Sequence, residues 1–237
     1  MNLLHECVLT DKCSYLPSKE QTAHYKIVSE CSSSFCTTLV QRGWRRFGKM
    51  FFRPICSDCN ECQSVKIDAV NYNFSKSERR IIKKNSHINT IIQKPSISYE
   101  HIDLFNKYHN FMHYKKGWDH NTTTPKSYFT SFVDGYETFG YEILYYDKDE
   151  LIAVDLIDII EDGISSIYFY YDPEYSNLSL GRYSIYKQIE LANALKKSWI
   201  YLGYYVKDCQ SLNYKNQYQP QLTLQNRPEE FEEDIWI

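Results

Sequence analysis

The sequence predicts a mixed α/β fold of the α+β kind, and a meander of strands followed by a helix and a last strand carries that prediction. Three alternating apolar runs, separated by short polar turns, indicate antiparallel strands at 139–146, 151–158 and 164–171. A helix with one apolar face begins near Leu180, and a buried strand at 199–206 follows it. We therefore expect a sheet with a covering helix in the second half of the chain.

The remaining elements follow from the same periodicities. A capping box formed by Ser75 and Glu78 opens a helix. The acidic tail beyond residue 220 is expected to be loosely held. The other predicted elements are a helix over 32–42 stopped by Gly43, an aromatic and basic strand or hairpin over 44–54, a half-buried strand at 63–70 and a helix over 99–116.

Composition and charge divide the chain into two parts. Of the 237 residues, 43% are hydrophobic and 24% charged, which is typical of a globular protein rather than a disordered one. Residues 1–97 carry 15 Lys and Arg against 8 Asp and Glu, whereas residues 98–237 carry 12 against 22. We therefore predict a basic N-terminal domain over 1–97 that faces a polyanion, and a second domain over 98–237.

No secretory leader or membrane-spanning run is visible, so we expect a cytoplasmic protein without a membrane partner.

A basic face on one predicted helix suits the backbone of a nucleic acid. Its cations recur at helical spacing and therefore lie on one side of the helix. Such a row can meet successive phosphates without reading their sequence. An ordinary solvated face is the alternative. The five residues are Lys76, Arg79, Arg80, Lys83 and Lys84.

Three evenly spaced cysteines indicate a possible metal site. Cys56, Cys59 and Cys62 form a C-x2-C-x2-C pattern, which lets a tight loop turn successive thiolates toward one ion or cluster. Cys13 is the best remote candidate for a fourth ligand. Disulfides are not expected in a reducing compartment. The spacing leaves a structural zinc, an iron–sulfur cluster and free thiols in a turn as alternatives.

The order of elements resembles the acyltransferase fold described for N-acetyltransferases, and we expect two such halves with the cysteine-rich loop in the first. In that fold the loop before the central helix offers backbone N–H groups to a phosphate or carbonyl. Leu180 and Gly181 occupy this place and are candidate donors to an oxyanion. The R/Q-x-x-G-x-G/A loop pattern of acetyltransferases is absent, which argues against coenzyme A but not against acyl transfer.

Eight short motifs in order resemble the arginyl-tRNA–protein transferase family, and most of all its bacterial aspartate/glutamate leucyltransferase branch. The match extends from about residue 13 to about residue 220. Two departures concern the fit of the amino-acid pocket: Leu212 lies where Met is expected, and Phe47 where a small polar residue is expected. The motifs are KCSYLP, GWRRFG, FFRPICSDCNEC, SERRIIKKN, YFYYDP, SLGRY, YLGYYV and NYK.

The resemblance implies an aminoacyltransferase that moves leucine from leucyl-tRNA onto proteins with N-terminal Asp or Glu and marks them for degradation. Attack by a neutral amine on an activated ester needs positioning and oxyanion donors more than a cofactor, so none is expected for the chemistry. The candidate bases are Asp158, Asp172 and a tyrosine acting through water, for which Tyr168 is the candidate. Asp172 before Pro173 equally suits a turn.

An acidic acceptor also requires a cation. Arg45 and Arg46 are adjacent in a predicted strand and so face opposite sides, while Lys215 follows the last strand. These three are the candidate acceptor-binding residues. The aromatic run from Tyr168 to Tyr171 could stack on the terminal adenosine, although such runs more often form core.

Three other functions remain open at this level. Two are enzymes: an arginyl-specific transferase and a coenzyme A-dependent N-acyltransferase. The third is a non-catalytic metal-thiolate protein that binds RNA through its basic half.

Overall fold

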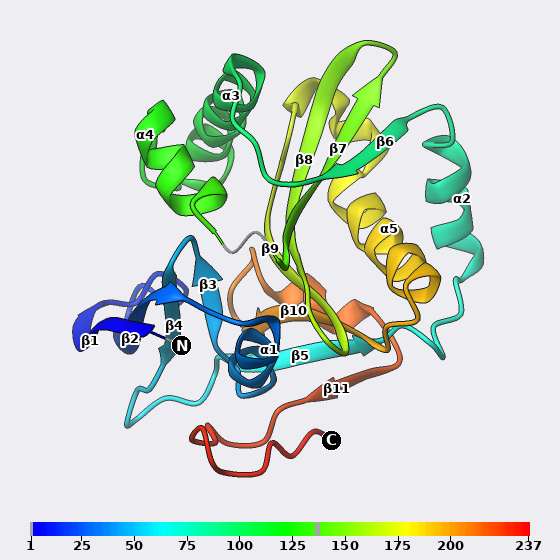
Figure 1. The fold of residues 1–237 in the computed structure, drawn as a ribbon. Helices are drawn as coiled ribbons and strands as arrows, with labels where there is room; N and C mark the ends of the chain where they lie inside the picture. The colour runs from blue at the N-terminus through cyan, green and yellow to red at the C-terminus, as the bar shows by residue number, and fades with distance from the viewer. Residues whose placement is uncertain (1, 136–137) are drawn as a thin grey trace.

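The computed structural model describes residues 2–135 and 138–237, and in this part of the chain the strands form two sheets (Figure 1). The smaller sheet has four strands in the order β1-β2-β4-β3, all antiparallel. The larger has seven in the order β11-β5-β10-β9-β8-β7-β6, antiparallel except between β9 and β10. A mixed α/β fold is therefore confirmed.

The large sheet contains the predicted meander. Strands β7, β8 and β9 pair in sequence order, and the predicted strands at 63–70 and 199–206 join them as β5 and β10. Two edge strands were not predicted. The bounds are β5 Gln63–Asp68, β6 Asn89–Gln93, β7 Gly140–Asp147, β8 Glu150–Ile159, β9 Gly163–Tyr171, β10 Trp199–Tyr205 and β11 Gln221–Thr223.

Helices cover both faces of the large sheet (Figure 1). Helix α3, Tyr99–Lys116, packs Leu104 and Phe105 against one face, whereas α5, Leu180–Ala194, packs Tyr186 and Ile189 against the other. Successive residues of a strand point to opposite faces, so each strand of the meander contributes to both cores. The other helices are α2 Lys76–Lys84, α4 Pro125–Tyr128, and the short segments η1 Phe129–Val133, η2 Pro173–Leu178 and η3 Asn213–Gln217.

The small sheet begins with a long hairpin that was not predicted. Strand β1, Asn2–Lys12, is exposed along almost its whole length and pairs with β2, Glu20–Glu30. The predicted hairpin at 44–54 is present as β3, Arg45–Phe47, and β4, Met50–Pro54. Helix α1, Ser33–Gln41, packs Leu39 and neighbouring apolar residues against this sheet.

The two halves expected on either side of residue 97 are joined in space. Strands β5 and β6 precede that residue, yet they lie in the same sheet as β7 to β11. The apolar core between the small sheet and α1 also includes Tyr201 of β10, so it is shared with the large sheet. Two acyltransferase-like halves are thus not confirmed. None of the helices in the described part of the chain combines the length and apolar character needed to cross a bilayer.

The C-terminal tail is held by specific contacts, so the expectation of a loose tail was wrong. Arg53 donates to the Pro228 carbonyl and pairs with Glu229, and Trp236 packs over the amine of Lys66 at 4.3 Å. Arg227 donates to the carbonyls of two residues in the cysteine-rich loop. Basic side chains of the N-terminal half therefore neutralise an acidic segment that composition alone describes as solvated.

Candidate functional site

The parallel strands β9 and β10 separate partway along their length. They pair over Gly163–Ser165 and Trp199–Tyr201. Beyond this point β9 continues to Tyr171 and β10 to Tyr205, while Gly203 takes a left-handed conformation, φ +81°, at an irregularity in β10. The separation leaves backbone groups of both strands available to side chains or to a substrate.

Arg45 of β3 occupies this opening. One nitrogen of its guanidinium donates to the Ser165 hydroxyl at 3.1 Å, and the other donates to the Ser166 carbonyl. A Cβ atom on Gly203 would lie only 2.8 Å from Arg45 Nε, so the glycine provides room as well as the backbone turn. Burial lowers the pKa of Arg45, although the group remains charged.

Lys215 of η3 lies beside Arg45. The residue is half-buried, and this burial, followed by the charge of Arg45, lowers the pKa of its amine to about 7. Burial raises the pKa of the neighbouring Tyr214 and Tyr15 to about 12, and the charge of Arg45 opposes both shifts. Among the described residues, neither Arg45 nor Lys215 forms an ion pair with a carboxylate. We call the group of Arg45, Lys215, Tyr15 and Tyr214, in which the charge of Arg45 acts on the other three, the cationic recess.

Arg46 points away from the recess, as the alternation along a strand requires. Its Nε and Nη2 donate to the two carboxylate oxygens of Asp158 at 2.9 and 2.5 Å, and its Nη1 donates to the Gly48 carbonyl at 2.6 Å. Both side chains are buried. Because Asp158 is occupied at both oxygens, the geometry favours a structural ion pair over the base and acceptor-binding roles considered for these residues.

Tyr168 faces the opposite side of the sheet, toward α3. Its hydroxyl lies 2.8 Å from His109 Nε2, and its ring stacks on Phe132 with centroids 5.5 Å apart. Burial raises the pKa of Tyr168 and lowers that of His109 to about 4, so both are neutral at neutral pH. These contacts favour the core role over stacking on adenosine.

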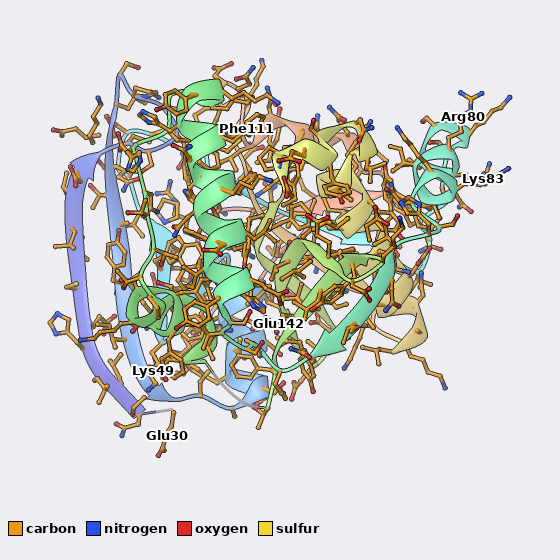
Figure 2. The ribbon with its side chains drawn as sticks, turned by 90° about the horizontal axis from the view of Figure 1, so that it is seen from above. Glu30, Lys49, Arg80, Lys83, Phe111 and Glu142 are labelled. Atoms are coloured by element: carbon orange, nitrogen blue, oxygen red, sulfur yellow. The ribbon has the colours of Figure 1, made fainter. Side chains whose placement is uncertain are left out.

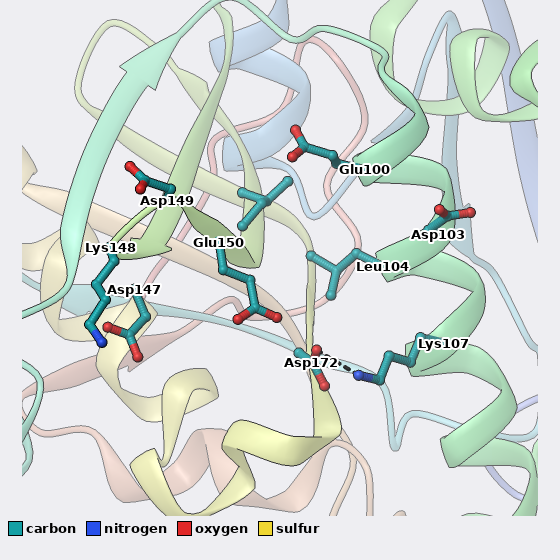
Figure 3. Close-up of a pocket in the computed structure, with 10 residues that line it drawn as sticks. Glu100, Asp103, Leu104, Lys107, Asp147, Lys148, Asp149, Glu150 and Asp172 are labelled. Carbon is teal, nitrogen blue, oxygen red and sulfur yellow. Dashed lines mark hydrogen bonds and ion pairs between the residues drawn. The ribbon is translucent and has the colours of Figure 1, made fainter.

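Asp172 lies at the start of η2, where it accepts from the backbone of Glu174 at 3.0 Å and pairs with Lys107 at 2.8 Å. Figure 3 shows this pair at the side of an open depression of about 640 Å³ between α3 and the β7–β8 turn, lined mainly by carboxylates. The turn role of Asp172 therefore accounts for its contacts. The depression belongs to other elements than those of the cationic recess.

Leu180 and Gly181 form the first turn of α5, directly after Ser179 in a left-handed conformation. The first N–H groups of a helix lack partners within it, so this end can accept an anion or a developing oxyanion. Gly181 lies beside Phe169, to whose ring a Cβ atom would be 3.7 Å away. The two residues thus stay candidates as donors.

The predicted basic face is present on α2. The capping box of Ser75 and Glu78 is formed, and all five cations are exposed. In Figure 2, Arg80 and Lys83 extend from the molecule into solvent. Lys84 also donates to the Asn177 carbonyl at 2.8 Å. This exposure is what a phosphate-binding surface requires.

Sequence reasoning missed a buried polar network beneath the recess. Asp155 of β8 is fully buried and accepts from Gln188 of α5 at 2.8 Å, and the same nitrogen donates to the Ser166 hydroxyl at 3.2 Å. Burial raises the pKa of Asp155 to about 7, and the bond from Gln188 opposes that shift. The available signal was an acidic residue in the middle of the apolar run LIAVDLI.

Comparison with known proteins places these residues in a family. The model described as the N terminus of arginine-tRNA-protein transferase matches residues 11–80, and that of its C terminus matches residues 100–225. The chain belongs to this family. Both matched segments contribute to the cationic recess, because Arg45 lies in the first and Lys215 in the second.

Relatives within the arginine-tRNA-protein transferase family carry the name aspartate/glutamate leucyltransferase. One from Campylobacter jejuni is 48% identical and covers 97% of this chain and 96% of its own. Two further relatives share the name. The one from Helicobacter hepaticus is 42% identical and covers 94% of this chain and 93% of its own. The one from Pseudomonas aeruginosa is 31% identical and covers 88% of both chains. The solved structure of FemX has a TM-score of 0.46 at 9% identity, over 71% of this chain and 59% of that one. The resemblance to the leucyltransferase branch is confirmed.

The candidate metal ligands interact electrostatically but are not arranged as a metal site. The charges of Cys13, Cys56 and Cys59 all act on Cys62, and burial together with them raises its pKa to about 12. Backbone N–H groups donate to the sulfurs of Cys13 and Cys56, both at 3.4 Å. Within the described residues, however, no three His, Cys, Asp or Glu side chains converge as metal ligands. The metal stays a prediction, and no reaction step depends on it.

Proposed function

We propose that this chain transfers leucine from leucyl-tRNA to the N-terminal Asp or Glu of acceptor proteins. We further propose that the cationic recess binds the acidic side chain of the acceptor. The observation that carries the proposal is that Arg45 lies at the opening between β9 and β10 and acts on the charge of Lys215, whose helix η3 packs on β10, while neither cation forms an ion pair with a carboxylate among the described residues. Two adjacent cations repel each other and lose hydration on burial, so they favour an anionic ligand. The side chain of an N-terminal Asp or Glu supplies that charge.

The two cations have different parts in this recognition. The guanidinium of Arg45 is oriented by Ser165 and by the Ser166 carbonyl, which leaves its remaining N–H groups for a carboxylate. Lys215 supplies a point charge that can approach the same carboxylate from η3. An amide side chain at the acceptor N-terminus would leave both cations unpaired, so the recess disfavours Asn and Gln.

The reaction needs little beyond positioning. The neutral α-amine of the acceptor attacks the carbonyl carbon of the leucyl ester, and a C–N bond forms as the C–O bond to the terminal ribose breaks. The proton lost by the amine ends on the departing ribose oxygen. An α-amine has a pKa of about 7.7–8.0, so a useful fraction is neutral at neutral pH without a strong base. No cofactor is required for these steps.

The surrounding architecture supports the same reaction. A meander, a covering helix and a parallel strand that separates from its neighbour form an acyltransferase-like core. The exposed cations of α2 suit the phosphates of the tRNA. Marking of the acceptor for degradation is the expected biological consequence.

A transfer assay tests the proposal. Purified protein is incubated with tRNA carrying labelled leucine, arginine or phenylalanine and with peptides that begin with Asp, Glu, Asn, Arg or Ala. We expect label from leucyl-tRNA on the Asp and Glu peptides. Transfer of arginine instead would establish the arginyl-specific alternative, and tRNA binding without transfer would establish the non-catalytic one.

A further inference from the structure

Ser166 lies where the buried polar network meets the cationic recess. Its carbonyl accepts from Arg45, and its hydroxyl accepts from Gln188 Nε2 at 3.2 Å. Ser166 itself is half-buried, whereas Gln188 and Asp155 are fully buried. The serine is therefore the member of the network that a substrate can reach.

The direction of these bonds determines what the Ser166 hydroxyl can do. Gln188 has two N–H groups on Nε2, and one is directed to Asp155 and the other to Ser166. Because the Ser166 oxygen is already an acceptor for Gln188, its own proton is left to donate elsewhere. In its ionised form Asp155 holds the amide in this orientation, since a carboxylate accepts hydrogen bonds but does not donate them.

Ser166 also fixes the position of this donor relative to Arg45, because its carbonyl accepts a hydrogen bond from that guanidinium. The charges of Asp155 and Arg45 both act on the pKa of Tyr214, and the charge of Arg45 also acts on that of Lys215. The network and Arg45 therefore meet at Ser166, in the part of β9 that no longer pairs with β10. An acceptor whose side chain pairs with Arg45 brings its α-amine, and the ester it attacks, close to Ser166.

On the basis of the proposed function, we infer that the Ser166 hydroxyl donates a hydrogen bond to the ester carbonyl oxygen of the leucyl group as it becomes an oxyanion. Gln188 and Asp155 act through it as positioning residues. Attack by the amine moves an electron pair onto that oxygen, and expulsion of the ribose oxygen returns it. A preorganised donor at this position is effective because it needs no reorientation when the charge develops.

Single-turnover transfer from saturating leucyl-tRNA to an Asp-peptide tests the role of Ser166. We expect Ser166→Ala to slow the transfer step about 100-fold, as for the loss of one oxyanion donor. Affinity for a tRNA carrying leucine through an unreactive amide should be unchanged, because the bond strengthens only in the transition state. Ser166→Thr should recover most of the rate. Ser165→Ala is the matched contrast: its hydroxyl contacts Arg45, so it should raise the KM for the peptide.

A double variant tests the positioning role. Gln188→Met should slow transfer in the wild-type background but have no further effect in the Ser166→Ala background, because it acts through that hydroxyl. Equal slowing in both backgrounds, or Ser166→Ala at the wild-type rate with a wild-type melting temperature, would overturn the inference. Absence of leucine transfer by the wild-type protein would instead overturn the proposed function and this role together.

Discussion

Arg46 holds both carboxylate oxygens of Asp158 inside the protein, whereas the neighbouring Arg45 contacts no carboxylate in the described part of the chain. Adjacent residues of one short strand thus have opposite roles, one in the core and one in the recess. The pair links β3 of the small sheet to β8 of the large one. It therefore joins the two sheets at the point where the site is built.

We predict that Arg46→Met destabilises the protein strongly. The change leaves Asp158 as a buried carboxylate without its cation, which costs about 3–5 kcal/mol of the free energy of unfolding. Denaturant titration measures the loss. Lys49→Met is the matched control, because Lys49 pairs with Asp134 at 2.9 Å on the surface, and such pairs contribute about 1 kcal/mol or less. Equal stability of the two variants would refute the structural role.

The basic face of α2 should account for part of the salt dependence of tRNA binding. Changing Arg79, Arg80 and Lys83 to Ala removes three exposed cations, which should reduce the slope of log K against log salt by about 2–3. The transfer rate at saturating tRNA should change little. A matched variant, in which Lys12, Lys115 and Lys126 become Ala, should keep the wild-type slope. If the two variants have the same slope, the basic face is only solvated surface.

The preference for an acidic acceptor should depend on pH through Lys215. Its pKa of about 7 lies below the ordinary lysine value, so the amine is charged below that pH and loses its charge as pH rises through it. The ratio of transfer to Asp-peptide over Asn-peptide should therefore fall between pH 6.5 and 8.5. Taking the ratio cancels the titration of the α-amine, which both peptides share. Lys215→Arg should keep the ratio constant, and a constant ratio in the wild type would contradict the assignment.

The spacing of the cysteines predicts a bound metal. Protein purified without oxygen should contain zinc, or an iron–sulfur cluster with its visible absorption, bound by Cys13, Cys56, Cys59 and Cys62. Ligand binding contributes to folding free energy, so Cys56→Ser should lose the metal and melt at a lower temperature. Cys7→Ser, in the exposed hairpin, is the control. Metal-free protein together with an unaltered melting temperature of Cys56→Ser would rule the site out.

Elements with strong periodicity were predictable from the sequence. Helix α3 spans the expected residues 99–116, and the meander strands differ from expectation by one residue at most ends. Strand β1 was not predicted because almost every residue in it is exposed, so its sequence has no alternation of apolar and polar residues. The ordered tail was not predicted because the residues that hold it, Arg42 and Arg53, are distant in sequence.

The candidate site was predictable in its residue types but not in its arrangement. Arg45 and Lys215 follow from the need for a cation, yet their meeting depends on β3 packing against the opening between β9 and β10. Asp158 was considered as a base because the sequence does not show that Arg46 reaches it. The pairing of Asp155 with Gln188 likewise joins a strand to a helix 33 residues away.

The ratio of transfer rates to Asp-peptide and Asn-peptide in Arg45→Met, measured beside Lys49→Met, tests the account most directly. Loss of one partner from a buried charge pair costs 2 kcal/mol or more, so the ratio should fall about 30-fold or more in Arg45→Met. Affinity for leucyl-tRNA and the ratio in Lys49→Met should remain at the wild-type value. A wild-type ratio in a folded Arg45→Met protein would contradict the claim that the cationic recess reads the acceptor.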